Sequence, residues 1–204
     1  AKMIFTKATT TTNGWACWHT GIGDTEGLVL SSTAAASSVT WWDQSNATST
    51  AFAHKAGTTS SQGGDIIAYV WSEVAGFSKI SSYTGNGSGT GPVIDCGFKP
   101  RFLLIKADIA GEDWVILDSA RNSSNPRNSI LKPNATELEY TNSVYNVNFT
   151  NTGFEVLNTN PRFNQNGGTY IYAAFAAKPD GSVIDSLVDS PSQTATPTDT
   201  GAGG

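Results

Sequence analysis

Apolar residues occur along the chain in short runs, and clusters of turn-forming residues separate one run from the next. The turn clusters include TGNGSGTGP at 84–92, NTG at 151–153 and QNGG at 165–168. The runs are rich in β-branched and aromatic residues, which favour strands, and they lie at 66–71, 102–106, 114–117, 145–149 and 170–175. This pattern predicts an all-β protein, built as one or more antiparallel β-sandwiches.

Helical patterns are confined to two short segments. They are STAAASS at 32–38 and PNATELEY at 133–140, and each is long enough for a turn or two. We therefore expect little helix.

The two halves of the chain resemble each other at matched positions. Lys7 and Trp15 match Lys106 and Trp114 at an offset of 99 residues. Further matches keep nearly the same spacing: Leu28 with Ile130 and Phe52 with Phe154 at 102, and Gly63 with Gly167 and Trp71 with Phe175 at 104. Loop insertions between matched strands produce such a slowly growing offset, so the sequence predicts a tandem duplication.

A single repeat would form a sheet with one apolar face, and exposing that face to water is unfavourable. Two related sheets packed face to face would bury both apolar faces. We therefore expect two pseudo-symmetric repeats, arranged as one sandwich or as two abutting lobes. The repeated Trp15 and Trp114 are interpreted as core residues rather than as ligand platforms.

Composition changes along the chain suggest four segments. Residues 1–75 form the first β repeat, 76–101 a glycine-rich connector with strand-like ends, and 102–182 the second β repeat. Within the connector, the stretch 84–91 is interpreted as a flexible connection. The last segment, 183–204, is rich in Ser, Thr, Pro and Gly and is interpreted as a linker to a further module. The chain is thus expected to be a piece of a longer protein.

The charge of the chain argues against some partners. A net charge of −5 and a pI of about 4.9 disfavour a nucleic-acid binder, and no apolar run is long enough for a membrane helix. Only 14% of the residues are charged, so Ser, Thr, Asn and Gly supply most of the polar surface. Cys17 and Cys96 lie in apolar settings, which favours two buried thiols over a single disulfide bridge.

Candidate catalytic groups are few, and each has an ordinary explanation. A hydrolytic carboxylate pair would have to come from Glu112 with Asp113, Glu137 with Glu139, or Asp24 with Glu26. Those near glycine are interpreted as solvated turn residues. The histidines, His19 and His54, lie outside any recognisable nucleophile motif. We predict that the protein is not an enzyme.

Two loops carry the hard oxygen groups that calcium prefers, at 23–27 and 43–46. Neither loop has the spacing of a known calcium site, so solvated turns are the favoured interpretation. No cofactor or metal is predicted, and calcium is the alternative.

The stretch TWWDQSN at 40–46 is the best candidate for carbohydrate binding. Adjacent side chains on a strand face opposite ways, so one of Trp41 and Trp42 would face outwards. An exposed Trp beside amide and carboxylate groups could stack on a sugar ring; the candidate site comprises Trp41, Trp42, Asp43, Gln44 and Asn46. The favoured alternative places one Trp in the core and the other under a loop or in a subunit interface.

Several longer motifs point to a family. They are GFKPRFLLIK at 97–106, WVILDSARN at 114–122, TGFEV at 152–156 and NGGTYIYAAFAAKP at 166–179. Together they resemble a repeat found in structural proteins of marine tailed bacteriophages. The connector at 76–92 is similar to that family's junction between two copies.

The resemblance implies a virion component of a tail fibre or another appendage, on the surface of the particle and made in the cytoplasm of an infected bacterium. Its expected partners are other virion proteins and further copies of itself, with a trimer as the candidate assembly. A host-surface glycan is a candidate ligand for adhesion and host recognition; no nucleic acid or membrane insertion is expected. The alternatives are a capsid-decorating or purely architectural protein and, second, a glycan-depolymerising fibre enzyme.

Overall fold

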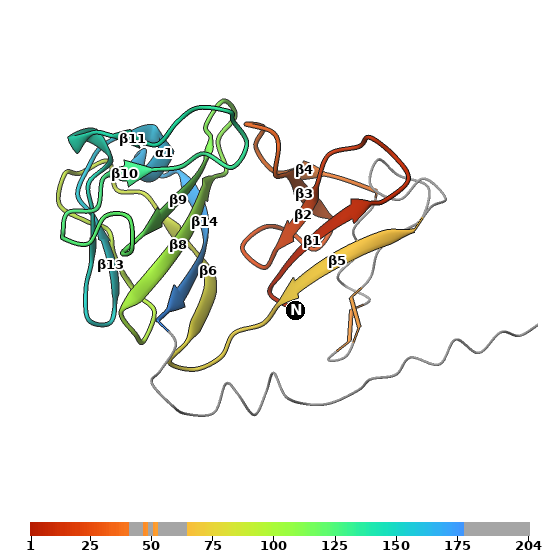
Figure 1. The fold of residues 1–204 in the computed structure, drawn as a ribbon, viewed down its shortest axis with the longest axis horizontal. Helices are drawn as coiled ribbons and strands as arrows, with labels where there is room; N and C mark the ends of the chain where they lie inside the picture. The colour runs from red at the N-terminus through yellow and green to blue at the C-terminus, as the bar shows by residue number, and fades with distance from the viewer. Residues whose placement is uncertain (41–46, 49–50, 53–64, 178–204) are drawn as a thin grey trace, which may run out of the picture.

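The computed structural model describes residues 1–40, 47–48, 51–52 and 65–177. These residues form strands joined by turns and loops, with almost no helix (Figure 1). The prediction of an all-β fold is confirmed. Within the described ranges the helical turns are η2 (Ser143–Tyr145) and α1 (Pro161–Asn164).

The strands of the first half of the chain are β1 (Met3–Ala8), β2 (Ala16–His19), β3 (Glu26–Val29), β4 (Ser37–Ser38) and β5 (Ile66–Trp71). Those that follow are β6 (Ser78–Thr84), β7 (Val93–Asp95), β8 (Pro100–Ala107), β9 (Trp114–Asp118), β10 (Ser129–Ile130), β11 (Tyr140–Thr141), β12 (Val147–Phe149), β13 (Gly153–Val156) and β14 (Thr169–Ala176).

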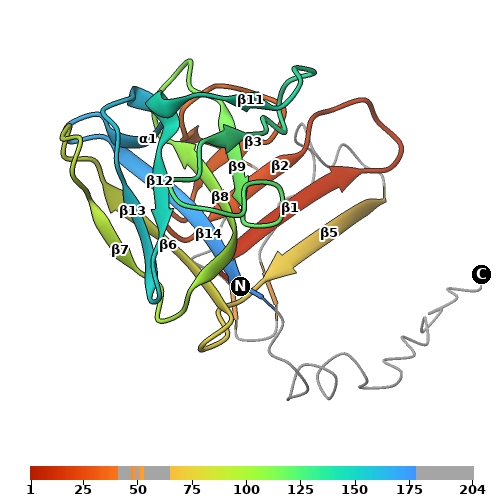
Figure 2. The same cartoon turned by 60° about the vertical axis from the view of Figure 1, so that its left-hand side comes forward.

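The strands form three layered sheets and a short ribbon. The N-terminal sheet has the order β4-β3-β2-β1-β5, the central sheet β6-β14-β8-β9 and the outer sheet β12-β13-β7, while β10 and β11 form the ribbon. All the pairings are antiparallel. Figure 2 shows the outer sheet on one side of the central sheet and the N-terminal sheet, edged by β5, on the other.

The central sheet is buried on both faces. One face packs against the outer sheet through residues such as Leu103, Tyr172 and Phe154. The other face packs against the N-terminal sheet through residues such as Leu104 and Cys17. Burial on both sides explains why residues 102–105 are a continuous apolar run rather than an alternating one.

The N-terminal and central sheets pair their strands in matched registers. Met3 lies opposite Trp71 in one sheet, and Phe102 lies opposite Phe175 in the other. These are the positions that the offsets of 99 and 104 equate. The faces of the two sheets that carry these matched residues pack against each other, as two repeats packed face to face would require. A common origin by duplication stays a prediction.

Both helical predictions are wrong. In the segment 32–38, the N–H of Ala36 donates to Asp108 Oδ1 at 2.6 Å, and the chain continues into β4. In the segment 133–140, the side chain of Asn134 bonds the turn before β9, and Leu138 is 90% exposed. A helix there would have had no apolar face to bury, and bonds to distant residues hold both segments in irregular conformations.

The glycine-rich connector is held in place by the second half of the chain. Its ends are β6, in the central sheet, and β7, in the outer sheet. Between them, the side-chain amide of buried Asn164 donates to Ser88 O at 2.7 Å and Gly91 O at 2.9 Å, and its Oδ1 accepts from Asn86 N at 2.7 Å. The prediction of a flexible connection is therefore wrong for residues 86–91, while the proposed domain boundaries stay predictions.

The two cysteines and the two repeated tryptophans have different outcomes. Cys17 and Cys96 are buried thiols, as predicted. Trp114 lies in the core between the two large sheets, with 1% of its surface exposed. Trp15, which directly precedes β2, is only half-buried. The core interpretation holds for Trp114 and is wrong for Trp15.

Candidate interaction surface

Exposed apolar side chains gather on β5 and at Val74, shortly after its end. The large hydrophobic residues that are exposed in the described part of the chain are Ile67, Tyr69, Val70, Val74, Val93, Leu138, Tyr140 and Val144. The first three belong to β5 and are 43%, 47% and 48% exposed. Edge strands of soluble proteins normally carry charges, prolines or bulges that prevent pairing with another chain, and the sequence IIAYVW has none of the charges or prolines.

An aromatic row runs along this edge of the N-terminal sheet. The ring centroids of Trp15 and Tyr69 are 5.8 Å apart, and those of Tyr69 and Trp71 are 6.3 Å apart. Phe5 contacts Trp71 edge-on at 5.1 Å. The row starts at the exposed end of the sheet and leads towards the N-terminal sheet's contact with the central sheet, because Phe5 and Trp71 both pack against that core.

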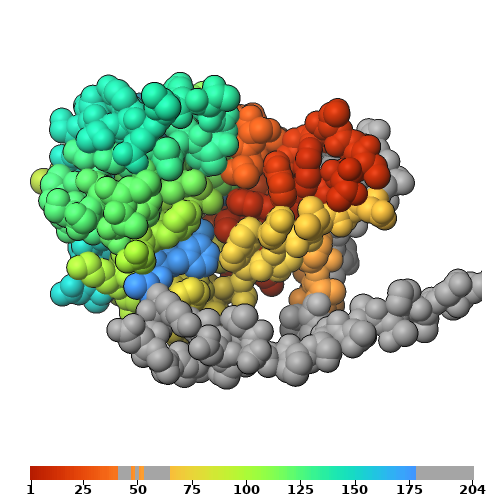
Figure 3. Space-filling model, in the orientation of Figure 1, coloured from red at the N-terminus to blue at the C-terminus, as the bar shows by residue number. Residues whose placement is uncertain are grey.

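The row ends at an apolar hollow of about 300 Å³ between the N-terminal and central sheets. Its wall from the first half comprises Met3, Phe5, Leu30 and Trp71, and its wall from the second half comprises Phe102, Leu104, Ile116, Pro133 and Phe175. Three residues of the first wall match three of the second at the offsets found in the sequence. Figure 3 shows β5 beside the end of β14 at this boundary.

A buried histidine joins the same two sheets. His19, at the end of β2, lies 3.0 Å from Tyr172 O in β14 through Nε2, and its Nδ1 accepts from Gly21 N at 2.9 Å. Nδ1 is therefore an acceptor, which makes Nε2 the protonated nitrogen of a neutral imidazole. Burial lowers the pKa of His19 to about 4, and the bond to Tyr172 only partly opposes this. The ring is a structural tie between sheets.

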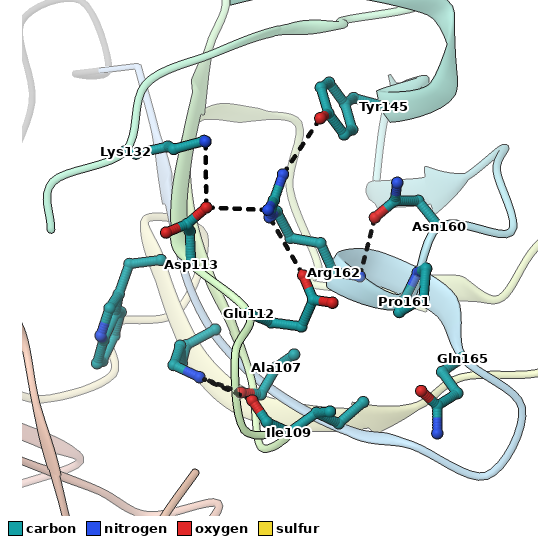
Figure 4. A network of polar contacts seen from close by, with 12 residues as sticks. Ala107, Ile109, Glu112, Asp113, Lys132, Tyr145, Asn160, Pro161, Arg162 and Gln165 are labelled. Atoms are coloured by element: carbon teal, nitrogen blue, oxygen red, sulfur yellow. Dashed lines mark hydrogen bonds and ion pairs between the residues drawn. The ribbon is translucent and has the colours of Figure 1, made fainter. Parts of the chain in front are cut away.

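The predicted carboxylate pair of Glu112 and Asp113 lies in an ion-pair network (Figure 4). Arg162, in α1, reaches Asp113 Oδ2 at 2.9 Å and Glu112 Oε2 at 3.4 Å, and Lys132 reaches Asp113 Oδ2 at 3.2 Å. Burial acts to raise the pKa of Asp113, but hydrogen bonds from Asn134 and Lys132 and the nearby positive charges lower it overall. A general acid needs the opposite shift, so the environment of Asp113 does not favour that role. Its ion pair with Arg162 connects the turn before β9 to α1.

Three of the other acidic candidates also have partners. Glu139 pairs with Arg121, and Glu137 pairs with Lys132 at 2.6 Å. In the loop at 23–27, Glu26 Oε2 accepts from Gly23 N at 3.0 Å, which closes the turn. No group of three or more metal-binding side chains occurs in the described ranges.

The repeated lysines share a role that the sequence did not suggest. Lys106 is fully buried, and its amine donates to Ala107 O and, at 3.4 Å, to Ile109 O. Burial lowers the pKa of Lys106 to about 8. Lys7, at the matched position, donates to Asn13 O. Each lysine thus binds a backbone carbonyl group in the turn that follows its strand, and Lys106 also binds that of Ala107, the last residue of β8.

The predicted sugar-binding residues Trp41, Trp42, Asp43, Gln44 and Asn46 lie outside the described residues, as does His54. The strongest local signal for the surface around β5 is the uncharged run at 66–71. That run also fits a buried strand, so the sequence alone could not distinguish the two.

Comparisons with known proteins connect both halves of the chain to one family. A family model described as a domain of unknown function, DUF7483, matches residues 1–179. No curated protein and no solved structure matches the chain. In the described ranges, no helix is long and apolar enough to cross a membrane. Since the family model spans both halves and most of the chain, the protein belongs to the DUF7483 family.

Proposed function

We propose that the protein is a non-enzymatic structural module of a phage virion, part of a tail fibre or another appendage, that contributes to adhesion at the host surface. The motifs at 97–106, 114–122, 152–156 and 166–179 support this proposal through their resemblance to phage structural proteins. Only 14% of the residues are charged, so neutral polar residues supply most of the polar surface, and such surfaces suit contacts made by hydrogen bonds outside the cell.

The observation that carries the proposal is the uncharged edge strand β5 beside the apolar hollow. An apolar edge of this kind is a hazard for an isolated soluble protein and an advantage for a subunit of an assembly. In contrast, Arg162, Lys132 and Arg121 form ion pairs with four of the acidic candidates, Glu112, Asp113, Glu137 and Glu139. This arrangement favours a structural role over hydrolysis.

Adhesion would then arise from many weak contacts. Rigid layers of sheet hold their loops at fixed positions, and a particle carrying many copies multiplies the avidity of each contact. The sugar-binding hypothesis for Trp41 and Trp42 supplies one such contact.

Immunogold electron microscopy of phage particles that encode this chain tests the location. Antibodies raised against the purified chain should label the tail or its appendages. Labelling of the capsid would replace the proposal with the capsid-decorating alternative. If the antibodies detect the chain in infected cells but label no purified particle, the virion proposal is wrong.

Cell binding separates adhesion from architecture. The fluorescently labelled chain should bind host cells, and either Trp41→Ala or Trp42→Ala should lose most of that binding with an unchanged melting temperature. Tyr140→Ala, an exposed aromatic in β11, is the matched control and should bind normally. Normal binding by both tryptophan variants would remove the sugar site at 41–46.

A further inference from the structure

We propose that the outer edge of β5 pairs with β5 of a second copy of this chain, antiparallel and about a two-fold axis. This inference extends the proposed function by identifying a partner and the surface that binds it. It concerns self-association in solution, so it can fail or succeed independently of any location in a virion.

The backbone groups of β5 alternate between its two edges. Thr9 N donates to Asp65 O at 2.9 Å, in the register that pairs β1 with β5. In an antiparallel ladder, alternate residues point their N–H and C=O groups towards the same neighbour. The backbone N–H and C=O groups of Ile66, Ala68 and Val70 therefore point away from β1. In the described part of the chain, no strand other than β1 pairs with β5.

The second half of the molecule shows how such an edge is completed. Asp108 N donates to Thr169 O at 2.8 Å, which reproduces the bond between Thr9 and Asp65 at the matched positions. The residues of β14 whose backbone N–H and C=O groups point away from β8 are then Tyr170, Tyr172 and Ala174. All three pair with β6. Strand β5 presents the same pattern of donors and acceptors without an equivalent of β6 among the described residues.

One register makes the β5 edge complementary to itself. When Ala68 lies opposite Ala68 of the other copy, Ile66 lies opposite Val70. The backbone N–H and C=O groups of Ile66 and Val70 both point away from β1, so the two residues can exchange hydrogen bonds across the axis. On the opposite face of the sheet, Ile67 then lies opposite Tyr69. Each exposed apolar side chain of β5 thus meets another across the axis, and pairs of aromatic and β-branched residues stabilise antiparallel sheets.

Charge also favours a second copy over a charged partner strand. Residues 66–71 contain no ionisable group other than the Tyr69 phenol, so β5 offers no charge with which to select an acidic or basic segment. A two-fold interface uses the same patch on both subunits, and dimers of this symmetry are the commonest homo-oligomers. The edge therefore predicts a dimer, in place of the trimer suggested by the fibre resemblance.

Mass measurement of the intact chain by light scattering and native mass spectrometry tests the dimer. The unchanged protein should be dimeric. Val70→Lys should be monomeric, because it places a charge beside the axis at a side chain that is exposed in the single chain. Val93→Lys makes the same change on an edge strand of the outer sheet and should stay dimeric. Ala68→Pro removes an outward N–H and should also be monomeric.

Disulfide trapping tests the register. Opposed residues of a hydrogen-bonded antiparallel pair have Cα atoms about 5.5 Å apart, a separation that a disulfide spans. Ala68→Cys should cross-link two copies under mild oxidation. Val70→Cys should not, because its counterpart lies four residues along the partner strand, about 13 Å away.

A monomeric unchanged protein would overturn the proposal, as would a dimer that persists in Val70→Lys. A dimer in which Val70→Cys cross-links and Ala68→Cys does not would overturn the proposed register. Thermal melting of each variant shows whether it folds, and Val70→Lys suffices if Ala68→Pro does not fold.

Discussion

Strands β5 and β14 occupy matched places in the two halves of the molecule, and their surroundings differ. Each pairs in the same register with one of two matched strands, β5 with β1 and β14 with β8. Strand β14 has β6 on its other edge and a layer of apolar side chains on each face. Every residue of β5 is partly or fully exposed. The comparison shows that strand pairing alone does not decide burial, which also depends on the elements that pack around each strand.

The largest effect expected from this comparison comes from the two matched tryptophans. Trp114→Ala removes a fully buried ring and its bond to Val29 O, and should lower the free energy of unfolding by about 3–5 kcal/mol. Trp15→Ala affects a half-buried ring and should lower it by about 1–2 kcal/mol. Urea denaturation measures both values. Equal losses would show that the two positions are equivalent after all.

The contact between the N-terminal and central sheets should be sensitive to acid. His19 has a folded-state pKa of about 4, below the ordinary value of 6.5, so the unfolded chain binds a proton that the folded chain excludes. The stability is complete above pH 6.5 and is lost as the pH falls towards 4, by on the order of 3 kcal/mol.

Melting temperatures between pH 7 and pH 4.5 measure this loss. His19→Gln should be less stable at pH 7 and should show a much weaker decline with acid. The residue that matches His19 in the second half is Asp118, which bonds to Arg121 instead of another sheet. A variant that declines as steeply as the unchanged protein would exclude His19 as the source.

The smallest effect concerns the matched lysines. Lys106→Met leaves two buried carbonyl groups without their donor but also removes a buried charge, so the free energy of unfolding should fall by about 1–2 kcal/mol. Lys7→Met affects a partly exposed side chain and should cost less than about 1 kcal/mol. Chemical denaturation of the two variants side by side decides the order, and a larger loss in Lys7→Met would contradict it.

The strand content could be predicted because the runs at 66–71, 102–106, 114–117 and 170–175 carry strong local patterns that the structure follows. The helical predictions failed because single distant bonds, such as that from Ala36 N to Asp108, determine those segments. The exposure of β5 was equally hidden, since an apolar run fits a buried strand or an uncovered edge. Distinguishing the two requires the neighbours of the strand, which sequence position does not reveal.

The ion pairs around Arg162 could not be predicted from the sequence either, because sequence position does not reveal which residues are neighbours in space. Its partners are Glu112 and Asp113, about 50 residues earlier in the chain, and only the fold brings the three together. Acidic residues beside a glycine fit a solvated turn, a catalytic pair or an ion pair equally well. The role of the repeated lysines was also hidden, because the carbonyl groups that they bind have no signature in the sequence.

The contact between the two large sheets has a consequence for synthesis on the ribosome. The last residue of β5 is Trp71, and the matched residue that packs against the same core, Phe175, is translated 104 residues later. At elongation rates of about 5–20 residues per second, this delay is roughly 5 to 20 s. During that interval the apolar face of the N-terminal sheet is not yet covered by the central sheet. We therefore expect chaperones that bind nascent chains to associate with this face until β14 has been synthesised.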